Sequence, residues 1–243
     1  MVLYTLNQLI MNKVHIGHSI KQSSVDASWC IIGNRQHIYY MDMFFLSFYM
    51  HAGGHAIIHL IGRRGRALWS TLWLVASNYT EYFADITRES FVLSRWMPGV
   101  FTNYKRVLWM KDLMLFDISS LFKWYPFFRG LRRMYGIPRL MFSFSQDISQ
   151  YIYNVGYKEP LVERVCVLGL VDTNINSSLS MVPIIGNDDT RTSIYYYHKV
   201  LAQYCFIGRY RRFCRFWWKF YWYIRYRSES TRLNSSHRTI SYA

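Results

Sequence analysis

The stretch RVCVLGLVD, Arg164 to Asp172, decides the fold. Every residue between its charged ends is apolar or glycine, so neither face of a strand built from it would carry a polar side chain. A strand with one face in water would instead alternate apolar and polar residues. A continuous apolar run of this length is typical of a central strand in a parallel sheet that helices cover on both sides. It therefore predicts an α/β protein.

The runs on either side of this stretch predict the other elements. Three are predicted as strands, namely HAIIHLIG (His55–Gly62), EYFADI (Glu81–Ile86) and RLMFSFS (Arg139–Ser145). A helix to Ser77 is expected after the first of them and a helix to about Tyr153 after the third. MVPIIG leads into a final long helix from Asn187. Strands and helices in alternation predict a doubly wound, mainly parallel sheet with right-handed crossovers.

Two segments do not fit this alternation. Lys105–Gly136 is predicted to form one or two short helices outside the sheet, broken at Pro126. In Gly208–Tyr226, ten of nineteen residues are aromatic and six are basic. The predicted division is an α/β domain over 1–207, with a helical insertion at 105–135, and a basic aromatic extension over 208–226.

Charge and composition narrow the class of protein. The 243 residues include 29 Lys and Arg against 14 Asp and Glu, a formal charge of +15, which predicts a polyanionic partner such as nucleic acid or an anionic membrane. A hydrophobic content of 51% excludes a disordered chain. Four cysteines without a CxxC pair predict reduced thiols. No arginine precedes Arg35, which argues against a signal or transit peptide. The sequence holds no run of about 18 uncharged apolar residues, so no membrane span is predicted.

The last residues, 227–243, are a separate case. STRLNSSH, two further residues and ISYA together resemble the translation of a common sequencing-library adapter with an index in its middle. This predicts that 227–243 is not part of the natural protein, the alternative being a polar disordered tail. Without its three arginines and one glutamate the net charge is still +13, so the prediction from charge stands.

The acidic pair Asp188 and Asp189 allows two interpretations. In the first, Gly186 makes a turn, Asn187 caps the final helix and both carboxylates lie in its first turn, where the helix dipole stabilises each by about 0.3–1 kcal/mol. In the second, the pair meets Asp172 at neighbouring strand ends and serves a metal-dependent, phosphohydrolase-like enzyme. No nucleophile, general base or lysine accompanies these acids as a set, so the cap is favoured.

Histidines and arginines between residues 51 and 66 raise two further possibilities. His51, His55 and His59 are spaced four apart and would align on a helix, but two glycines interrupt them and the strand prediction separates them. No metal site is therefore predicted. The turn GRRGR (Gly62–Arg66) holds three arginines, whose spread charge suits a phosphate backbone better than a nucleotide pocket. The alternative is a solvated basic turn.

Several motifs, in order and at similar spacing, resemble those of the bacterial-type small-subunit ribosomal protein two family. They are VHIGH (Val14–His18), RQHIYYMD (Arg35–Asp42), RWMPGVFTNYK (Arg95–Lys105), GIP (Gly136–Pro138), LVDTN (Leu170–Asn174) and GNDD (Gly186–Asp189). The chain departs from the family at Pro98, Arg139 and Ile185, and VERV stands where the family has GIP before the strand that ends at Asp172. Only about thirty residues remain where bacterial members carry a long helical hairpin, so that projection is expected to be shortened.

The resemblance implies a flavodoxin-like fold and a structural role in the small ribosomal subunit, with no catalytic residue, no cofactor beyond the structural Mg²⁺ of rRNA, and no small-molecule substrate. The implied partners are small-subunit rRNA and neighbouring ribosomal proteins, near the mRNA path. Divergent motifs, the shortened hairpin and a composition rich in Phe, Tyr, Ile and Trp favour a mitochondrial ribosome, with a plastid or a reduced bacterium as the alternative origins. The acidic pair then belongs to the family architecture. An α/β enzyme and a basic membrane-associated protein remain the alternatives, the second because the aromatic extension could lie on a membrane surface.

The expected rRNA contacts are side chains in basic segments: Lys21, Arg35, Arg63, Arg64, Arg66, Arg95, Asn103, Lys105, Arg106, Arg209, Arg211, Arg212 and Arg215. The residues that carry the family signature are His15, Gly17, His18, Trp96, Asp172, Asn174, Gly186, Asn187, Asp188 and Asp189. Among them Trp96 is expected to pack in the core rather than stack on a base.

Overall fold

The computed structural model of the chain describes residues 4–63, 65–71, 74–93, 96–113, 125–144 and 158–240. Its main sheet has five strands in the order β5-β4-β6-β7-β8, all neighbours parallel. The strands are β4 (Ala67–Ser70), β5 (Ser90–Val92), β6 (Leu140–Ser143), β7 (Cys166–Val171) and β8 (Val182–Ile185). Counted along the chain, this is the 2-1-3-4-5 order of flavodoxin-like folds, which confirms the predicted fold class.

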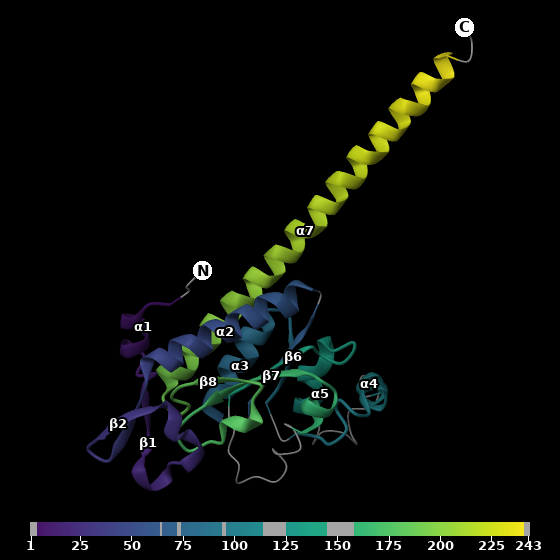
Figure 1. The fold of residues 1–243 in the computed structure, drawn as a ribbon. Coiled ribbons are helices and arrows are strands. Elements are labelled where there is room, and N and C mark those ends of the chain that lie inside the picture. Colours follow the sequence, from purple (N-terminus) through teal and green to yellow (C-terminus); the bar gives the residue numbers. More distant parts are fainter. Residues whose placement is uncertain are drawn as a thin grey trace.

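Helices cover both faces of this sheet (Figure 1). One face carries α2 (Met43–Gly62), α3 (Leu74–Ile86) and α7 (Arg191–Ile240), which enclose Trp69, Phe142 and Leu168. The other face carries α4 (Tyr104–Leu113), α5 (Tyr125–Gly130) and the 3-10 turn η3 (Leu131–Arg133). There Leu68 and Val167 join the second apolar cluster. Strand β7 is therefore buried on both faces, as its sequence predicts.

A smaller antiparallel sheet is built from the N-terminal residues, in the order β1-β3-β2. Helix α1 (Leu6–Met11) precedes β1 (Ile16–Ser19), β2 (Ile31–Arg35) and β3 (Ile38–Met41), with 3-10 turns η1 (Ile20–Gln22) and η2 (Val25–Cys30) between β1 and β2. A two-residue turn joins β2 to β3, because Arg35 pairs with Ile38. Its residues Gln36 and His37 have φ of 53° and 63°, the left-handed values that type I′ hairpin turns require.

Two of the predicted strands are wrong. HAIIHLIG is the end of helix α2, and EYFADI lies in helix α3. The apolar run was too short to separate a strand from a buried helix, and the buried residues Met50, Ile57 and Ile61 show helical spacing. The helix predicted to reach Ser77 is also wrong, because strand β4 occupies Ala67–Ser70 and α3 begins at Leu74.

The other predicted elements fare differently. RLMFSFS forms β6, as predicted, whereas the helix expected up to Tyr153 lies outside the described residues. In the insertion, Pro126 does not break a helix but stands second in α5, where its missing N–H is harmless. Phe127 and Phe128 of α5 pack on the sheet, so these helices are part of the core rather than a projection. Residues 114–124 of the insertion lie outside the described part.

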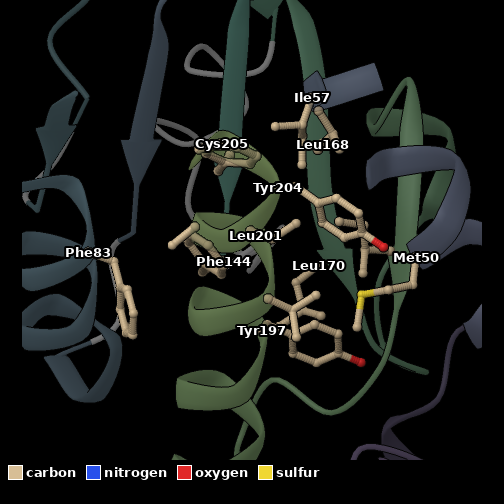
Figure 2. Packing of buried hydrophobic residues seen from close by; sticks show 14 of the residues in the cluster. Met50, Ile57, Phe83, Phe144, Leu168, Leu170, Tyr197, Leu201, Tyr204 and Cys205 are labelled. Atoms are coloured by element: carbon tan, nitrogen blue, oxygen red, sulfur yellow. The ribbon is translucent and has the colours of Figure 1, made fainter. Parts of the chain in front are cut away.

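Helices α2 and α7 approach closely because glycine stands at their contact. A Cβ added at Gly54 would lie 2.3 Å from Cζ of Tyr204, and one at Gly208 would lie 3.3 Å from Cα of Ile58. Figure 2 shows Tyr197, Leu201 and Tyr204 of α7 among Leu168 and Leu170 of β7 and Met50 of α2. This contact fixes the direction in which α7 leaves the body, past the C-terminal end of α2 (Figure 1).

Among the described residues, α2 is the helix whose length and apolar composition would allow it to cross a membrane. Leu46, Met50, Ile57 and Ile61 of this helix are fully buried against the sheet and α7. A core helix passes the same test of length and composition, and its burial makes α2 part of the core.

Candidate nucleic-acid interface

Three of the sequence motifs meet at the C-terminal ends of β7 and β8. His18 of β1 lies between two carboxylates, with Nδ1 3.3 Å from Oδ1 of Asp172 and Nε2 3.1 Å from Oδ2 of Asp189. The backbone N–H of Asp188 donates to Oδ2 of Asp172 at 3.1 Å. Parallel strands bring their carboxyl ends to one edge of the sheet, which explains why residues 172 and 188 meet. We call His18, Asp172, Asp188 and Asp189 the motif cluster.

Backbone hydrogen bonds fasten the N-terminal segment to this cluster. The N–H of His18 donates to Oγ1 of Thr173 at 2.9 Å, and the N–H of Asn187 donates to the carbonyl of Val14 at 3.0 Å. A Cβ at Gly17 would lie 2.5 Å from Cγ2 of Thr173, so only glycine allows the strand to come this close. VHIGH, LVDTN and GNDD therefore form one structural unit although they are far apart in sequence.

The predicted helix cap is wrong in its details. Oδ1 of Asn187 does accept two backbone N–H groups, from Asp189 at 2.8 Å and Thr190 at 3.0 Å. However, α7 begins only at Arg191 and has no acidic residue in its first turn. A carboxylate oxygen of Asp188 lies near Asp172 and His18 instead, and Oδ2 of Asp189 lies 3.1 Å from Nε2 of His18.

Electrostatic coupling within the motif cluster is strong. The carboxylates of Asp172 and then of Asp189, which lie beside its ring nitrogens, raise the pKa of His18 to about 10 in spite of its burial. Hydrogen bonding from His18 in turn lowers the pKa of Asp189. Burial, reinforced by the charge of Asp172, raises the pKa of Asp188 well above its ordinary value. Asp172 also accepts hydrogen bonds from the N–H and Oγ1 of Thr173, so its carboxylate serves the backbone turn.

The predicted rRNA contacts lie in separate regions of the surface. Lys21 and Arg35 belong to the N-terminal sheet region, and Asn103, Lys105 and Arg106 lie at the start of α4. Arg64 and Arg95 lie outside the described residues. Trp96 is 4% exposed and meets Phe101 edge to face with centroids 5.1 Å apart, so its ring packs in the core.

A cavity of about 1020 Å³ lies between the end of α2 and the first exposed turns of α7. We call it the basic groove. Its lining consists of one glycine, two aromatic rings and six cationic side chains: Gly62, Phe213, Phe216, Arg63, Arg66, Arg209, Arg212, Arg215 and Lys219. The groove unites two segments that the sequence marked separately, the GRRGR turn and the aromatic extension. They meet because the glycine contacts direct α7 past the end of α2.

The cations of the basic groove differ in what they already bind. Arg209 forms an ion pair with Glu89, and Arg66 donates to the carbonyl of Arg133 at 2.7 Å. Within the part of the chain that the structure describes, Arg212 and Arg215 form no ion pair with a carboxylate. Their charges therefore remain available to an anionic partner.

Comparison with known proteins identifies the family. Residues 9–208 match the family model described as ribosomal protein S2. The chain belongs to the ribosomal protein S2 family. Small ribosomal subunit protein uS2 of Bartonella quintana (strain Toulouse) is 24% identical over 219 residues, which cover 82% of this chain and 84% of the relative. The uS2 proteins of Methylocella silvestris and Rickettsia typhi are 24% and 23% identical, covering 82% and 81% of this chain and 62% and 72% of the relatives.

Membership of the S2 family gives the chain a structural role in the small ribosomal subunit rather than an enzymatic one. This confirms the resemblance drawn from the motifs. The family match ends at Gly208, so the α7 side of the basic groove, Arg209 to Lys219, lies beyond it.

Two buried glutamates that sequence analysis did not identify hold segments that carry predicted rRNA contacts. Glu89, 4% exposed, accepts from the N–H of Ala67 at 3.0 Å and from Arg209. Glu159 accepts from the N–H groups of Gly99 and Phe101 and so holds the turn of the RWMPGVFTNYK motif. Neither glutamate stands in a distinctive local pattern; their roles arise from segments that meet only in the fold.

Proposed function

We propose that this S2 family member binds small-subunit rRNA through the basic groove. The observation that carries the proposal is the meeting of six cations from two distant segments around one cavity of about 1020 Å³. Arginine and lysine neutralise phosphates and release counterions, and such contacts fix orientation without base-specific readout. The rings of Phe213 and Phe216 offer flat apolar surfaces beside these charges, on which sugars or unpaired bases can pack.

Further contacts are proposed for the cations outside the groove. Lys21 and Arg35 at the N-terminal sheet and Asn103, Lys105 and Arg106 at the start of α4 would extend the binding surface over the body. The exposed aromatic side chains of α7, including Trp217 and Trp218, would meet rRNA or neighbouring ribosomal proteins near the mRNA path. A partner surface shared between RNA and protein suits a helix whose exposed faces mix charge and aromatic area.

Removing two groove charges tests the proposal. Arg212→Gln with Arg215→Gln should weaken binding of the purified chain to small-subunit rRNA about 10- to 100-fold at moderate salt. The slope of log K against log salt should fall by roughly 1.5, since each lost phosphate contact removes about 0.7–0.9. Arg191→Gln with Lys199→Gln is the matched control, because it removes the same charge from exposed positions on the same helix. Equal loss from both pairs, measured by filter binding across salt, would contradict the groove as binding site.

We also propose that the ribosome concerned is mitochondrial. Support comes from the shortened insertion, the departures from the family motifs and the high content of 21 Tyr, 16 Phe and 9 Trp. Peptides of the chain should sediment with the small subunit when a mitochondrial lysate is fractionated on a sucrose gradient and analysed by mass spectrometry. Peptides confined to soluble or membrane fractions would exclude this assignment. The same measurement tests residues 227–243, because the adapter interpretation expects no peptide beyond Arg227 in the subunit peak.

A further inference from the structure

The motif cluster gathers metal-binding side chains from three distant segments. His18, Asp172 and Asp188 each place one possible ligand atom so that all three lie within 4.8 Å of one another. Both carboxylates are buried, with Asp172 1% exposed and Asp188 5% exposed. Two buried carboxylates this close repel each other unless a positive charge offsets them, which a proton on His18 or a metal ion can supply.

One oxygen of this cluster lacks a partner. Oδ1 of Asp188 is buried and accepts no hydrogen bond from any residue that the structure describes. Buried polar atoms in native proteins are almost always paired, because an unpaired acceptor loses its hydration without compensation. A cation at this position would satisfy the free oxygen and offset both negative charges.

The imidazole of His18 is oriented for such a cation. Its Nε2 faces Oδ2 of Asp189 at 3.1 Å, so the Nε2–H can donate to that carboxylate. Its Nδ1 lies on the side of Asp172, at 3.3 Å, and forms no hydrogen bond within the described residues. A carboxylate that holds one ring nitrogen while the other nitrogen binds metal is the usual outer partner of a metal-ligating histidine.

We propose that Nδ1 of His18 and the carboxylates of Asp172 and Asp188 bind one divalent metal ion, with Asp189 orienting the imidazole. The donor set of one imidazole and two carboxylates fits Zn²⁺, which accepts nitrogen and oxygen together, better than Mg²⁺, which prefers oxygen and water. A water would complete four ligands. The role is structural: the ion would join the N-terminal segment to the ends of β7 and β8. This inference is independent of the basic groove.

Zinc retention by the full-length chain tests the proposal. The chain is loaded with Zn²⁺, dialysed against metal-free buffer and analysed for bound metal, and its thermal unfolding is recorded with and without a chelator. About one zinc per chain should remain, and Zn²⁺ at a hundred times its dissociation constant should raise Tm by roughly 5–10 °C. Asp188→Asn should lose most of the bound zinc and all of the chelator effect. Asp189→Asn, which keeps the three ligands, should bind zinc about 10- to 100-fold more weakly.

A surface histidine pair supplies the matched control. His51 and His55 of α2 have Nε2 atoms 3.1 Å apart and could hold zinc on their own. His51→Asn with His55→Asn should therefore retain zinc like the unmodified chain. The proposal is overturned if neither of these two proteins retains zinc, since the cluster is then held by protons on His18 and Asp188. It is also overturned if zinc is lost with the histidine pair but kept in Asp188→Asn. The first of these outcomes is measured on the unmodified chain and the histidine-pair variant alone. The proposal can therefore be tested even if Asp188→Asn fails to fold.

Discussion

Alanine at Gly54 is expected to lower the free energy of unfolding by about 3 kcal/mol, the upper end for one methyl forced into a packed core. Helix propensity alone predicts the opposite, since alanine in a helix interior is favoured over glycine by about 1 kcal/mol. The added Cβ would lie 2.3–2.7 Å from three ring atoms of Tyr204, which is itself buried, so the ring cannot swing aside. Helices α2 and α7 would have to separate. Urea unfolding followed by circular dichroism measures the loss.

Two further variants show whether the close helix contact is the cause. Gly62→Ala places its Cβ 3.4 Å from the carbonyl oxygen of Gly208, an ordinary contact, and should change stability by less than about 0.5 kcal/mol. Tyr204→Ala removes the ring, so adding Gly54→Ala in that background should cost little. Equal effects of Gly54→Ala with and without the ring would show that the helix contact is not what demands glycine at 54.

Loss of Arg209 is the second large effect that the structure predicts. Arg209→Met leaves the carboxylate of Glu89, 4% exposed, without its cation, and should destabilise the chain by about 3 kcal/mol at pH 8. Burial already raises the pKa of Glu89 although Arg209 opposes the shift. Without Arg209 the folded state binds a proton that the unfolded state has released, so stability falls as pH rises from about 5 to 8. The loss should therefore be smaller at pH 5.

Glu89→Gln separates the charge from the hydrogen bond. The amide oxygen can still accept the N–H of Ala67, and Arg209 is partly exposed to water, so this variant should cost only about 1 kcal/mol. Combined with Arg209→Met it should recover about 2 kcal/mol relative to the sum of the single variants, and the pH dependence should disappear. Chemical unfolding at pH 5 and 8 decides the matter; additive, pH-independent losses would rule out a buried ion pair.

Sequence patterns predict the parts of this fold that are decided locally. The continuous apolar run of β7 and the run of β6 carry their own burial pattern, and both strands lie where they were expected. HAIIHLIG was predicted wrongly, because eight residues of which five are apolar fit a strand as well as the inner face of a buried helix. Tertiary packing determines that this segment is helical, because Gly54 accommodates Tyr204, which lies 150 residues further along the chain. No local pattern records that contact.

The site shows the same division. Arg63 and Arg212 were each identified from local clusters of charge, but their meeting in one groove depends on the direction of α7. The acidic pair could be placed near Asp172 from the rule that strand ends meet, whereas His18 enters from a separate sheet. Interactions between distant segments form both the basic groove and the motif cluster. The order of the motifs along the chain does not reveal how close they lie in the fold.

The motif cluster has a consequence for how the chain is made. His18 binds Thr173 across 155 residues of sequence, so β1 leaves the translating ribosome long before its partners exist. Contacts between residues this far apart in sequence form late in folding, since the entropy of the intervening chain must be lost before they can form. The N-terminal hairpin must wait, exposed, until β7, β8 and the turn at Asn187 have been synthesised and folded. The part of the molecule that emerges first is thus the last to be fastened.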